Sequence, residues 1–500
     1  MDWPGGSGRR WRTRPPTPRS KPFLYLLLSL PLFLLLFLFL YLSPFASFSS
    51  PPLPSASLCS RLSLSDQRFL WYAPHSGFTN QVSELKNALL IGAILNRTVI
   101  VPPVLDHHAV ALGSCPKFRV TSPATLRAAV WDHIMELVRD QRYVSIADIV
   151  DISSVSASMV RTIDFRVFAS IWCGRDMKKA CFSSMCCSLS TMRHITDLSD
   201  QCRYLISGLN PISSTSTCIY PVEDDCRTTV WTYQQHTDKE LDSFQPDESL
   251  KKKKNISYVR TRKDVYRSLG PGTVPDRAAI LAFGTVFSAP YKGSQSYIDI
   301  HASSTDLKIK HLIEKIEFLP FASEIMQAGR KFALENMKVP FLCAQLRLLD
   351  GQFKNHWKGT FSALKDKLRS LNQDNTISGT IDIFIMTDLP RENWTKTYLD
   401  EIDRDKKYKV YTLDERDDLV VGAAKGVMKA ELGIKSGFLP RNLDVHGSQE
   451  SCALGSYLPD VLLYVEESVC SCASLGFIGT AGSTIAESIE LMRKNNVCDL

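Results

Sequence analysis

The sequence predicts an α/β protein with parallel sheets, carried behind an N-terminal membrane anchor. Short apolar runs of strand length alternate with segments of helical periodicity, and this alternation is typical of doubly wound parallel sheets. A separate run, residues 23–42, contains no charged residue. The roughly 435 residues beyond residue 65 are too many for one hydrophobic core, so we expect two domains.

The alternation is clearest in the C-terminal part of the chain. Strands are expected at 341–347, 381–386, 408–412 and 475–479, and helices at 361–371, 394–402, 419–432, 458–465 and 484–493. Upstream, a strand at 278–287 is followed by helical spacing over 307–337 with a break at Pro320. We therefore place the boundary between the two domains near residue 337.

A strand, a turn and a helix are also expected near residue 75. Residues 69–73 read as a strand, residues 74–81 as a turn containing Gly77, and apolar residues at helical spacing follow before the next strand at 98–101. Backbone N–H groups and the helix dipole at such a turn can bind an anion, which makes a phosphate site reasonable. One glycine is a weak signal, because many turns between a strand and a helix have this appearance.

The most informative charged residue is Arg347. It follows the apolar run that begins at Pro340, which reads as a buried strand. Ligands of open α/β sheets bind beyond the carboxyl ends of the strands, and a guanidinium there can contact a phosphate with two hydrogen bonds. The alternative is a structural ion pair with a surface carboxylate such as Asp350.

Four motifs together resemble the GDP-fucose protein O-fucosyltransferase family. The turn at 74–81, followed by the strand that ends in Pro102-Pro103, resembles the first family motif. Gln345-Leu346-Arg347 resembles its His-Leu-Arg motif, Thr387-Asp388 a Thr-Asp pair, and residues 476–484 its third motif. The motifs occur in family order, but Gln345 stands where the family usually has histidine.

The resemblance implies the GT-B architecture, in which two Rossmann-like doubly wound domains face a cleft. Residues 66–337 would form the N-terminal, acceptor-side domain, and residues 338–500 the C-terminal domain that binds the nucleotide sugar. The implied reaction is an inverting, metal-independent transfer of fucose from GDP-fucose to a hydroxyl of a protein or polysaccharide, with no cofactor beyond the donor substrate.

The site residues are carried over from the matching motifs. Arg347 would oppose the charge that develops on the β-phosphate, and Asn80 would help to hold the diphosphate or the sugar. The remaining donor-binding positions are Gly77, Phe78, Gln345, Asp388 for the nucleoside, and Ser483 and Thr484 for phosphate oxygens. We identify no general base, since Asp350 is close in sequence to Arg347 but can simply orient it.

Other functions remain open at this point. Related plant proteins include rhamnosyltransferases that use a UDP sugar and a pectin acceptor. A catalytically weak lumenal binding or scaffold protein is a further alternative, because Gln345 can form hydrogen bonds but cannot carry charge. A metal-dependent transferase is disfavoured: the Asp-x-Asp sequence, Asp403-Arg404-Asp405, reads as a solvated helix end, and no EF-hand loop occurs.

The N-terminus predicts a single-pass type II membrane protein. Residues 1–22 form a basic tail, residues 23–42 an anchor and residues 43–65 a stem rich in Ser and Pro. At about 1.5 Å per residue the anchor spans roughly 30 Å, the thickness of the bilayer core, and it is longer than the core of a signal peptide. The basic tail should stay cytosolic, which places the rest in the lumen, and the family resemblance favours the Golgi.

Cysteines and possible glycan acceptors agree with a lumenal location. All 14 cysteines follow the anchor, and seven of them lie between Cys173 and Cys226 at spacings that suit disulfides better than zinc. Three Asn-x-Ser/Thr sequences begin at Asn96, Asn255 and Asn393.

Two further features carry weaker expectations. His107-His108 is interpreted as a wall of the acceptor cleft or as ordinary surface, because adjacent histidines on a strand point to opposite sides. The four lysines at 251–254 indicate a solvated loop, with contact to an anionic glycan as the alternative. The net charge of +7 resides largely in the basic tail, so nucleic-acid binding is not expected.

Overall fold

The computed structural model describes nine segments of the chain. They are residues 67–106, 123–173, 219–222, 262–286, 307–337, 340–349, 357–373, 379–439 and 458–499. The chain divides into two units, Met1–Pro54 and Ser55–Leu500, and all described residues belong to the second. The predicted tail, anchor and stem lie outside the described residues, as do His107-His108, the four lysines at 251–254 and the side chains of the cysteine-rich stretch. None of the described helices is long and apolar enough to span a bilayer.

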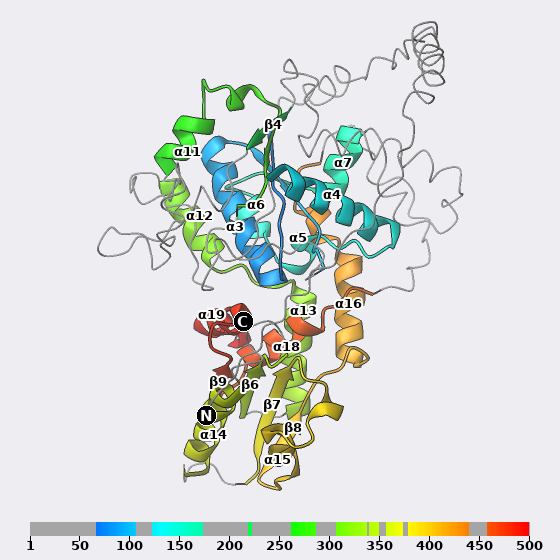
Figure 1. Cartoon of the computed structure of the whole chain (residues 1–500), viewed down its shortest axis with the longest axis vertical. Helices are drawn as coiled ribbons and strands as arrows, with labels where there is room; N and C mark the ends of the chain where they lie inside the picture. The colour runs from blue at the N-terminus through cyan, green and yellow to red at the C-terminus, as the bar shows by residue number, and fades with distance from the viewer. Residues whose placement is uncertain are drawn as a thin grey trace, which may run out of the picture. The chain divides into compact units, whose positions relative to one another are not determined.

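The first sheet has five parallel strands in the order β3-β2-β1-β5-β4. The strands are β1 (Phe69–Trp71), β2 (Thr98–Val101), β3 (Thr162–Asp164), β4 (Ile219–Val222) and β5 (Ile280–Phe283). Its helices are α3 (Phe78–Leu95), α4 (Pro123–Arg139), α5 (Ile146–Ile149), α6 (Ser153–Ser156), α7 (Phe165–Cys173), α11 (Arg262–Leu269), the 3-10 turn η1 (Pro275–Arg277) and α12 (Leu307–Glu317). Figure 1 shows α3 and α4 among the helices gathered around these strands.

Side chains of β1 show why both faces of this sheet are covered. Leu70 and Tyr72 belong to one buried hydrophobic cluster, and Phe69 and Trp71 belong to another. Alternate residues of a strand point to opposite faces, so an uninterrupted apolar run requires packing on both sides.

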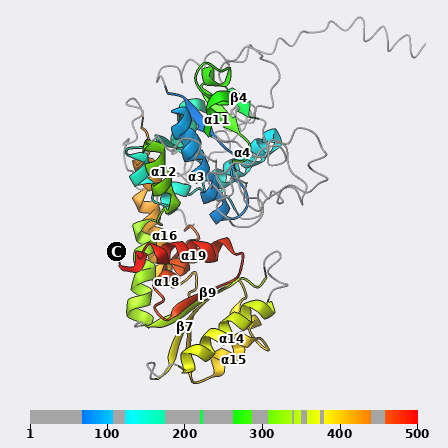
Figure 2. The same ribbon diagram turned by 90° about the vertical axis from the view of Figure 1, so that its left-hand side faces the viewer.

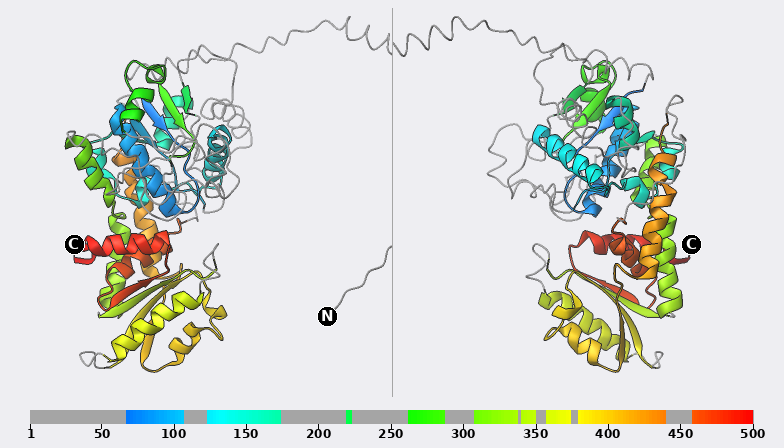
Figure 3. Two further views of the ribbon diagram at one scale, coloured as in Figure 1. Left: turned by 60° about the vertical axis from the view of Figure 1, so that its left-hand side comes forward. Right: turned by 90° about the vertical axis from the view of Figure 1, so that its right-hand side faces the viewer.

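The second sheet has four parallel strands in the order β8-β7-β6-β9. They are β6 (Phe341–Leu346), β7 (Ile381–Thr387), β8 (Tyr408–Tyr411) and β9 (Gly476–Gly479). The accompanying elements are α13 (Ser323–Lys331), the π-helix η3 (Phe332–Met337), α14 (Trp357–Gln373), the 3-10 turn η5 (Arg391–Asn393), α15 (Tyr398–Arg404), α16 (Asp418–Ala430), α18 (Leu462–Ser471), α19 (Thr484–Lys494) and the 3-10 turn η6 (Val497–Asp499). The short helix α17 (Leu432–Lys435) packs on the first sheet instead. Figures 2 and 3 show α14 and α15 on one face of this sheet and α13, α18 and α19 on the other.

The predicted α/β class with two parallel sheets is confirmed. The predicted break at Pro320 is also observed, since α12 ends at Glu317 and α13 begins at Ser323. Pro320 instead accepts a hydrogen bond from the N–H of Asp151, at 2.8 Å. The domain limits of 66–337 and 338–500 remain a prediction, as does the facing of two domains across a cleft.

Two predicted helices start later than expected. The helix expected from Trp394 begins at Tyr398, because Thr397 caps its N-terminus through the N–H of Leu399, and Trp394 lies in the turn before it. The helix expected from Leu458 begins at Leu462, whose N–H is bound by the carboxylate of Asp460 at 3.1 Å. In both cases a polar side chain that can bind a backbone N–H determines where the helix begins.

The chain returns to the first sheet after α16. Gly433 donates its N–H to the buried carboxylate of Asp148 at 2.8 Å, and Phe438 donates to the carbonyl of Thr162 at 2.6 Å. Ile434 is buried in the hydrophobic cluster that covers one face of the first sheet. A short segment from the second half of the sequence therefore belongs to the packing of the first.

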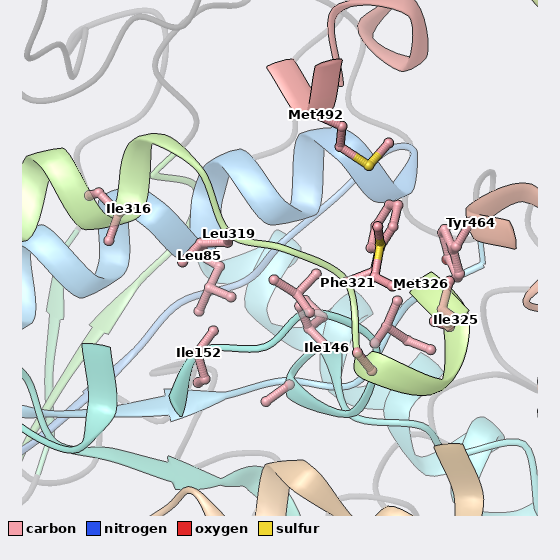
Figure 4. Close-up of a cluster of buried hydrophobic side chains, with 14 of the residues drawn as sticks. Leu85, Ile146, Ile152, Ile316, Leu319, Phe321, Ile325, Met326, Tyr464 and Met492 are labelled. Atoms are coloured by element: carbon pink, nitrogen blue, oxygen red, sulfur yellow. The ribbon is translucent and has the colours of Figure 1, made fainter. Parts of the chain in front are cut away.

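A shared hydrophobic cluster includes residues from both halves. Figure 4 shows Phe321 and Met326 beside Tyr464 of α18, with Met492 of α19 and Leu85 of α3 in the same cluster. These side chains are buried or nearly so, which makes their packing a main source of stability for this region.

Candidate functional site

Each sheet has a point where the strand order reverses. In the first sheet the chain runs outward from β1 through β2 to β3, and β5 and β4 lie on the other side of β1. In the second sheet it runs from β6 through β7 to β8, and β9 lies on the other side of β6. Ligands of open α/β sheets bind beyond the carboxyl ends of the strands at such switch points. The residues that follow β1, β5, β6 and β9 are therefore the first candidates for a site.

The turn after β1 leads directly into the N-terminus of α3. Gly77 is the N-cap residue in an extended conformation, and the N–H groups of Asn80 and Gln81 both bind its carbonyl, at 3.0 and 3.1 Å. The left-handed conformation in this turn belongs to Ser76, with φ of 65°, and not to the glycine. A glycine N-cap has no side chain to cap the first N–H groups of the 18-residue helix. The N–H groups at this helix start can therefore donate hydrogen bonds to an anion.

The turn is held in place by Gln81. Its amide group donates to the carbonyls of Ser76 and Leu105, at 2.8 and 2.9 Å, and accepts from the N–H of Leu105 at 2.9 Å. Gln81 is fully buried, so these hydrogen bonds tie the turn firmly to the segment after β2. Asn80, predicted to contact the diphosphate or the sugar, lies half-buried at the start of the helix.

A cluster of buried polar side chains lies beside this turn. His75 is 5% exposed, and its ring nitrogens contact the hydroxyls of Ser76 and Thr285 at 2.8 and 3.0 Å. Glu84 of α3 is fully buried and accepts from the N–H groups of His75 and Val286 and from the Thr285 hydroxyl, each at 3.1 Å. This cluster joins the ends of β1 and β5 at the switch point of the first sheet.

Burial shifts the titration of both charged members of that cluster. Burial lowers the pKa of His75 to about 3. Burial raises the pKa of Glu84 to about 8, against the hydrogen bonds from Val286, His75 and Thr285, which lower it. At neutral pH the imidazole of His75 is therefore uncharged, and the carboxyl group of Glu84 can be either protonated or ionised.

Arg347 follows β6 at the switch point of the second sheet. Its backbone N–H donates to the hydroxyl of Thr480 at 2.9 Å, which links the end of β6 to the residue after β9. Its side chain is partly exposed. The predicted position of Arg347, just beyond the carboxyl end of a central buried strand, is thus observed.

Gln345 takes part in the same link. Its side-chain carbonyl and its backbone carbonyl both accept from the N–H of Thr480, at 3.2 and 3.0 Å. The Thr480 hydroxyl donates to the Gln345 backbone carbonyl at 3.1 Å. Since Gln345 is 3% exposed, its observed role is to hold the loop after β9 against β6. At the position where the family usually has histidine, the glutamine side chain therefore helps to hold the loop after β9.

Asp388 follows β7, the other neighbour of β6. Its two carboxylate oxygens accept from the N–H groups of Leu348 and Leu349, at 2.7 and 3.0 Å. These are the two residues after Arg347, so the carboxylate fixes the backbone that carries the guanidinium. The role predicted for Asp388, orientation of the nucleoside, stays a prediction beside this positioning role.

The loop after β9 ends in a second helix N-terminus. Gly482 has φ of 74°, and the N–H of Ser483 binds the carbonyl of Thr480 at 3.0 Å, which describes a type II turn. Ser483 is the N-cap of α19, the helix that begins at Thr484. Its hydroxyl is buried and has no hydrogen-bond partner in the part of the chain that the structure describes. A buried unpartnered hydroxyl at a helix N-terminus calls for an acceptor such as a phosphate oxygen.

The structure thus gathers the predicted residues into two groups. Gly77, Phe78 and Asn80 lie together at the start of α3, and the other predicted residues surround the end of β6; these are Gln345, Arg347, Asp388, Ser483 and Thr484. Phe78 of the first group packs against a helix of the second sheet, since the centroids of the Phe78 ring and the Tyr464 ring in α18 lie 4.4 Å apart. As predicted, Asp403 and Asp405 lie at a helix end, where Asp403 pairs with Arg391 at 2.9 Å.

Sequence reasoning missed the cluster of His75, Ser76, Glu84 and Thr285. Thr285 is 210 residues from His75 in the chain, and only the pairing of β1 with β5 brings them together. A partial signal did exist, because His75 comes just after a predicted strand and Thr285 lies near the carboxyl end of another, the strand expected at 278–287. Glu84 was hidden by its place in a helix that is buried on nearly all sides.

One curated relative decides the family. The chain is 55% identical over 435 residues to "O-fucosyltransferase 30" of Arabidopsis thaliana, which covers 86% of this chain and 84% of that protein. The chain belongs to the O-fucosyltransferase family. The resemblance predicted from the four motifs is therefore confirmed.

Solved structures similar to this chain are distant from it in sequence and in structure. A crystal structure of POFUT1 in complex with GDP has a TM-score of 0.36 at 11% identity, covering 86% of this chain and 96% of that chain. A POFUT1 complex with GDP-fucose has a TM-score of 0.35 at 12% identity, covering 85% and 93%. No family model matches the sequence. Family membership rests on the Arabidopsis relative alone.

Proposed function

We propose that the chain is a type II membrane glycosyltransferase that transfers fucose from GDP-fucose to a hydroxyl of a protein or glycan acceptor. The proposed reaction is inverting and metal-independent. The observation that carries the proposal is the 55% identity to a protein named an O-fucosyltransferase, extending over 86% of this chain. The two switch-point groups give this activity a physical basis.

The donor diphosphate is assigned to the end of β6. Cleavage of the bond between the sugar and the diphosphate builds negative charge on the β-phosphate and positive charge on the sugar. Arg347 supplies a fixed cation at this point, and the N-terminus of α19 supplies N–H groups and the hydroxyls of Ser483 and Thr484. Both contributions gain strength as the negative charge develops.

The positive charge of the site comes from the protein itself in this proposal. A guanidinium and a helix N-terminus can take the place that a divalent cation occupies in metal-dependent transferases. Asp388 holds the backbone after Arg347 in position, and Thr480 ties that backbone to the loop after β9. A preorganised cation of this kind needs little rearrangement during the reaction.

The sugar is assigned to the turn after β1. The N–H groups at Gly77 and Phe78 and the side chain of Asn80 lie at the uncapped start of α3. Gln81 and the buried cluster at His75 keep this turn rigid. In this proposal the acceptor approaches the sugar from the N-terminal, acceptor-side domain, residues 66–337.

We also propose that the described part of the chain lies in the Golgi lumen, behind an anchor at residues 23–42. Two disulfides in the described residues, Cys343–Cys470 and Cys472–Cys498, support an oxidising compartment. Asn96 and Asn393, each at the start of a possible glycan acceptor sequence, are exposed. Protease protection of microsomes and removal of N-glycans would test the topology.

The deciding experiment uses the purified lumenal portion with GDP-fucose and a panel of glycopeptide and oligosaccharide acceptors in EDTA. Release of GDP together with a mass gain of one deoxyhexose on an acceptor is the expected result. UDP-rhamnose serves as the matched alternative donor. Transfer from UDP-rhamnose and not from GDP-fucose would contradict the proposed donor, and binding of neither sugar nucleotide would contradict the proposed activity.

A further inference from the structure

Four side chains form a continuous row of hydrogen bonds beside the turn after β1. The Ser76 hydroxyl lies 2.8 Å from Nδ1 of His75, and Nε2 of His75 lies 3.0 Å from the Thr285 hydroxyl. The Thr285 hydroxyl in turn lies 3.1 Å from Oε2 of Glu84. We call this row the Ser76–Glu84 relay. It crosses from β1 to β5 at the switch point of the first sheet.

The relay runs from a half-buried end to a fully buried end. Ser76 is partly exposed, whereas His75, Thr285 and Glu84 are 5%, 4% and 0% exposed. Ser76 also has φ of 65°, a left-handed conformation that non-glycine residues rarely adopt. The exposed end of the relay is directly adjacent to Gly77, where the sugar is assigned.

The hydrogen-bond partners give the relay a direction. When Glu84 is a carboxylate it only accepts, so Thr285 donates to it. The Thr285 oxygen, at 3.0 Å, is a nearer acceptor for Nε2–H of His75 than Oε1 of Glu84, at 3.4 Å. Nδ1 of the neutral imidazole is left as an acceptor for the Ser76 hydroxyl. A hydroxyl bound to a neutral imidazole that is oriented by further groups is the arrangement used to activate hydroxyls in enzymes.

We propose that the Ser76–Glu84 relay is the general base of the transferase, with Ser76 as the residue that contacts the acceptor hydroxyl. This inference rests on the proposed function. The acceptor oxygen forms a bond to C1 of fucose, and the bond from C1 to the β-phosphate oxygen breaks with its electron pair leaving on GDP. The acceptor proton moves to the Ser76 oxygen, and the proton of Ser76 moves to Nδ1 of His75. The proton of Nε2 then moves to Thr285, and that of Thr285 moves to Glu84.

The transfer keeps every hydrogen bond of the relay and reverses its direction. His75 changes tautomer but stays neutral, which suits a ring whose pKa burial lowers to about 3. Glu84 receives the proton, and burial raises its pKa to about 8, close to the pH at which the enzyme would work. Tyr72, the residue after β1, also interacts with Glu84, and burial together with the Glu84 charge raises the pKa of Tyr72. The proton returns to solvent by the same route after the product leaves.

The test is a pair of variants at Thr285. Thr285→Val removes the hydroxyl from the relay with little change in volume, and Thr285→Ser retains the hydroxyl. Since general base catalysis contributes about 100-fold or more, we expect Thr285→Val to lower kcat by about 100-fold with the KM for GDP-fucose unchanged. Thr285→Ser should keep kcat within about threefold, and calorimetric binding of GDP should be equal in all three proteins.

Two further readouts separate a relay from a structural role. The wild-type kcat should fall in D2O with a curved dependence on the deuterium fraction, because several protons move together, and Thr285→Val should lose this curvature. Ser76→Gly removes the entry hydroxyl at a backbone conformation that suits glycine, so it should fold normally and show the same loss of kcat.

The outcomes distinguish this inference from the proposed function. Wild-type turnover with an equal kcat in Thr285→Val and Ser76→Gly would overturn the relay and leave the transferase intact. A wild-type protein that binds GDP-fucose but neither transfers nor hydrolyses it would overturn the proposed function, and the relay with it.

Discussion

The two switch points of this protein have the same position in their sheets but opposite chemistry. The turn after β1 is built on buried titratable side chains, with His75 and Glu84 joined through Thr285. The loop after β6 carries the partly exposed Arg347, and its backbone is held by Thr480, Gln345 and the carboxylate of Asp388. Under the two proposals, the second sheet supplies a fixed positive charge and the first sheet supplies a path for a proton.

The stabilising groups differ in the same way. Asp388 is the carboxylate of the second site, and both of its oxygens accept hydrogen bonds from the backbone that follows Arg347. Glu84 is the carboxylate of the first site, and burial keeps it close to protonation at neutral pH. Asp388 positions a loop through two backbone N–H groups, while Glu84 is proposed to exchange a proton. The predictions below test this contrast.

The largest effect is expected for Arg347→Ala. Removing a preorganised charge from the diphosphate site should lower kcat by about 100- to 1000-fold, as in other sites that stabilise a developing anion. Initial rates of GDP release with GDP-fucose measure this. Arg391→Ala is the matched control, because Arg391 pairs with Asp403 at an exposed helix end. Equal losses in both variants would contradict a specific role for Arg347.

A smaller effect is expected for Asp388→Ala. This change leaves the N–H groups of Leu348 and Leu349 without their carboxylate partner, and the loop that carries Arg347 should become mobile. We expect kcat to fall by about tenfold and the free energy of unfolding to fall by about 2 kcal/mol. Asp388→Asn retains one acceptor oxygen and should lie between the two proteins in both measurements. A change in stability with no change in kcat would separate Asp388 from the site.

The disulfides should contribute unequally to stability. Cys343–Cys470 joins β6 to α18 across 127 residues of sequence, whereas Cys472–Cys498 spans 26 residues. Because a longer loop loses more entropy on closure, the Cys343→Ala/Cys470→Ala variant should lose about 1 kcal/mol more stability than Cys472→Ala/Cys498→Ala. Urea denaturation of the two double variants measures the difference, and the reverse order would argue against the loop-entropy explanation.

A further effect is the pH dependence that Glu84 contributes to stability. Its pKa is raised from 4.5 to about 8 by burial, so between these values the folded protein binds more protons than the unfolded chain. Its stabilising contribution is therefore fully present below pH 4.5 and is lost as the pH rises through 8. Burial also raises the pKa of Glu467 to about 8, with the same sign.

The measurement is urea denaturation of the wild type and Glu84→Gln at pH 6 and pH 8.5. The wild type should lose stability over this interval, and the variant should lose less. His75 has an opposite and smaller effect at pH 6, because its lowered pKa reduces stability as the pH falls below about 6.5. This effect is common to both proteins, so the difference between them reports Glu84. A steeper loss in Glu84→Gln would contradict the raised pKa.

The sequence predicted where the residues around the end of β6 and the turn after β1 would lie, but it did not predict the polar cluster beside that turn. A buried strand that ends in a charge, followed by a Thr-Asp pair and a Ser/Thr-rich turn, predicted the positions of Arg347, Asp388 and Ser483, which parallel pairing with β7 and β9 then brings together. The contacts of the first site join residues that lie far apart in the chain, such as His75 and Thr285.

Helical periodicity explains why Glu84 was also missed. The apolar spacing of Val82, Leu85 and Leu89 predicts a helix with one buried face, on which Glu84 would be solvated. In the structure α3 is buried on nearly all sides, so polar residues such as Glu84 and Asn87 are enclosed and hydrogen-bonded. Periodicity cannot indicate a second covering layer that comes from distant segments.

The central claim is that a nucleotide diphosphate binds at the end of β6 through Arg347 and the N-terminus of α19. Calorimetric titration of the lumenal portion with GDP in EDTA, using the wild type, Arg347→Ala and Arg391→Ala, tests it most directly. We predict that the wild type and Arg391→Ala bind GDP with equal affinity, and that Arg347→Ala binds at least about tenfold more weakly, as expected for the loss of a charge-assisted contact. Equal binding of GDP by all three proteins would contradict the claim.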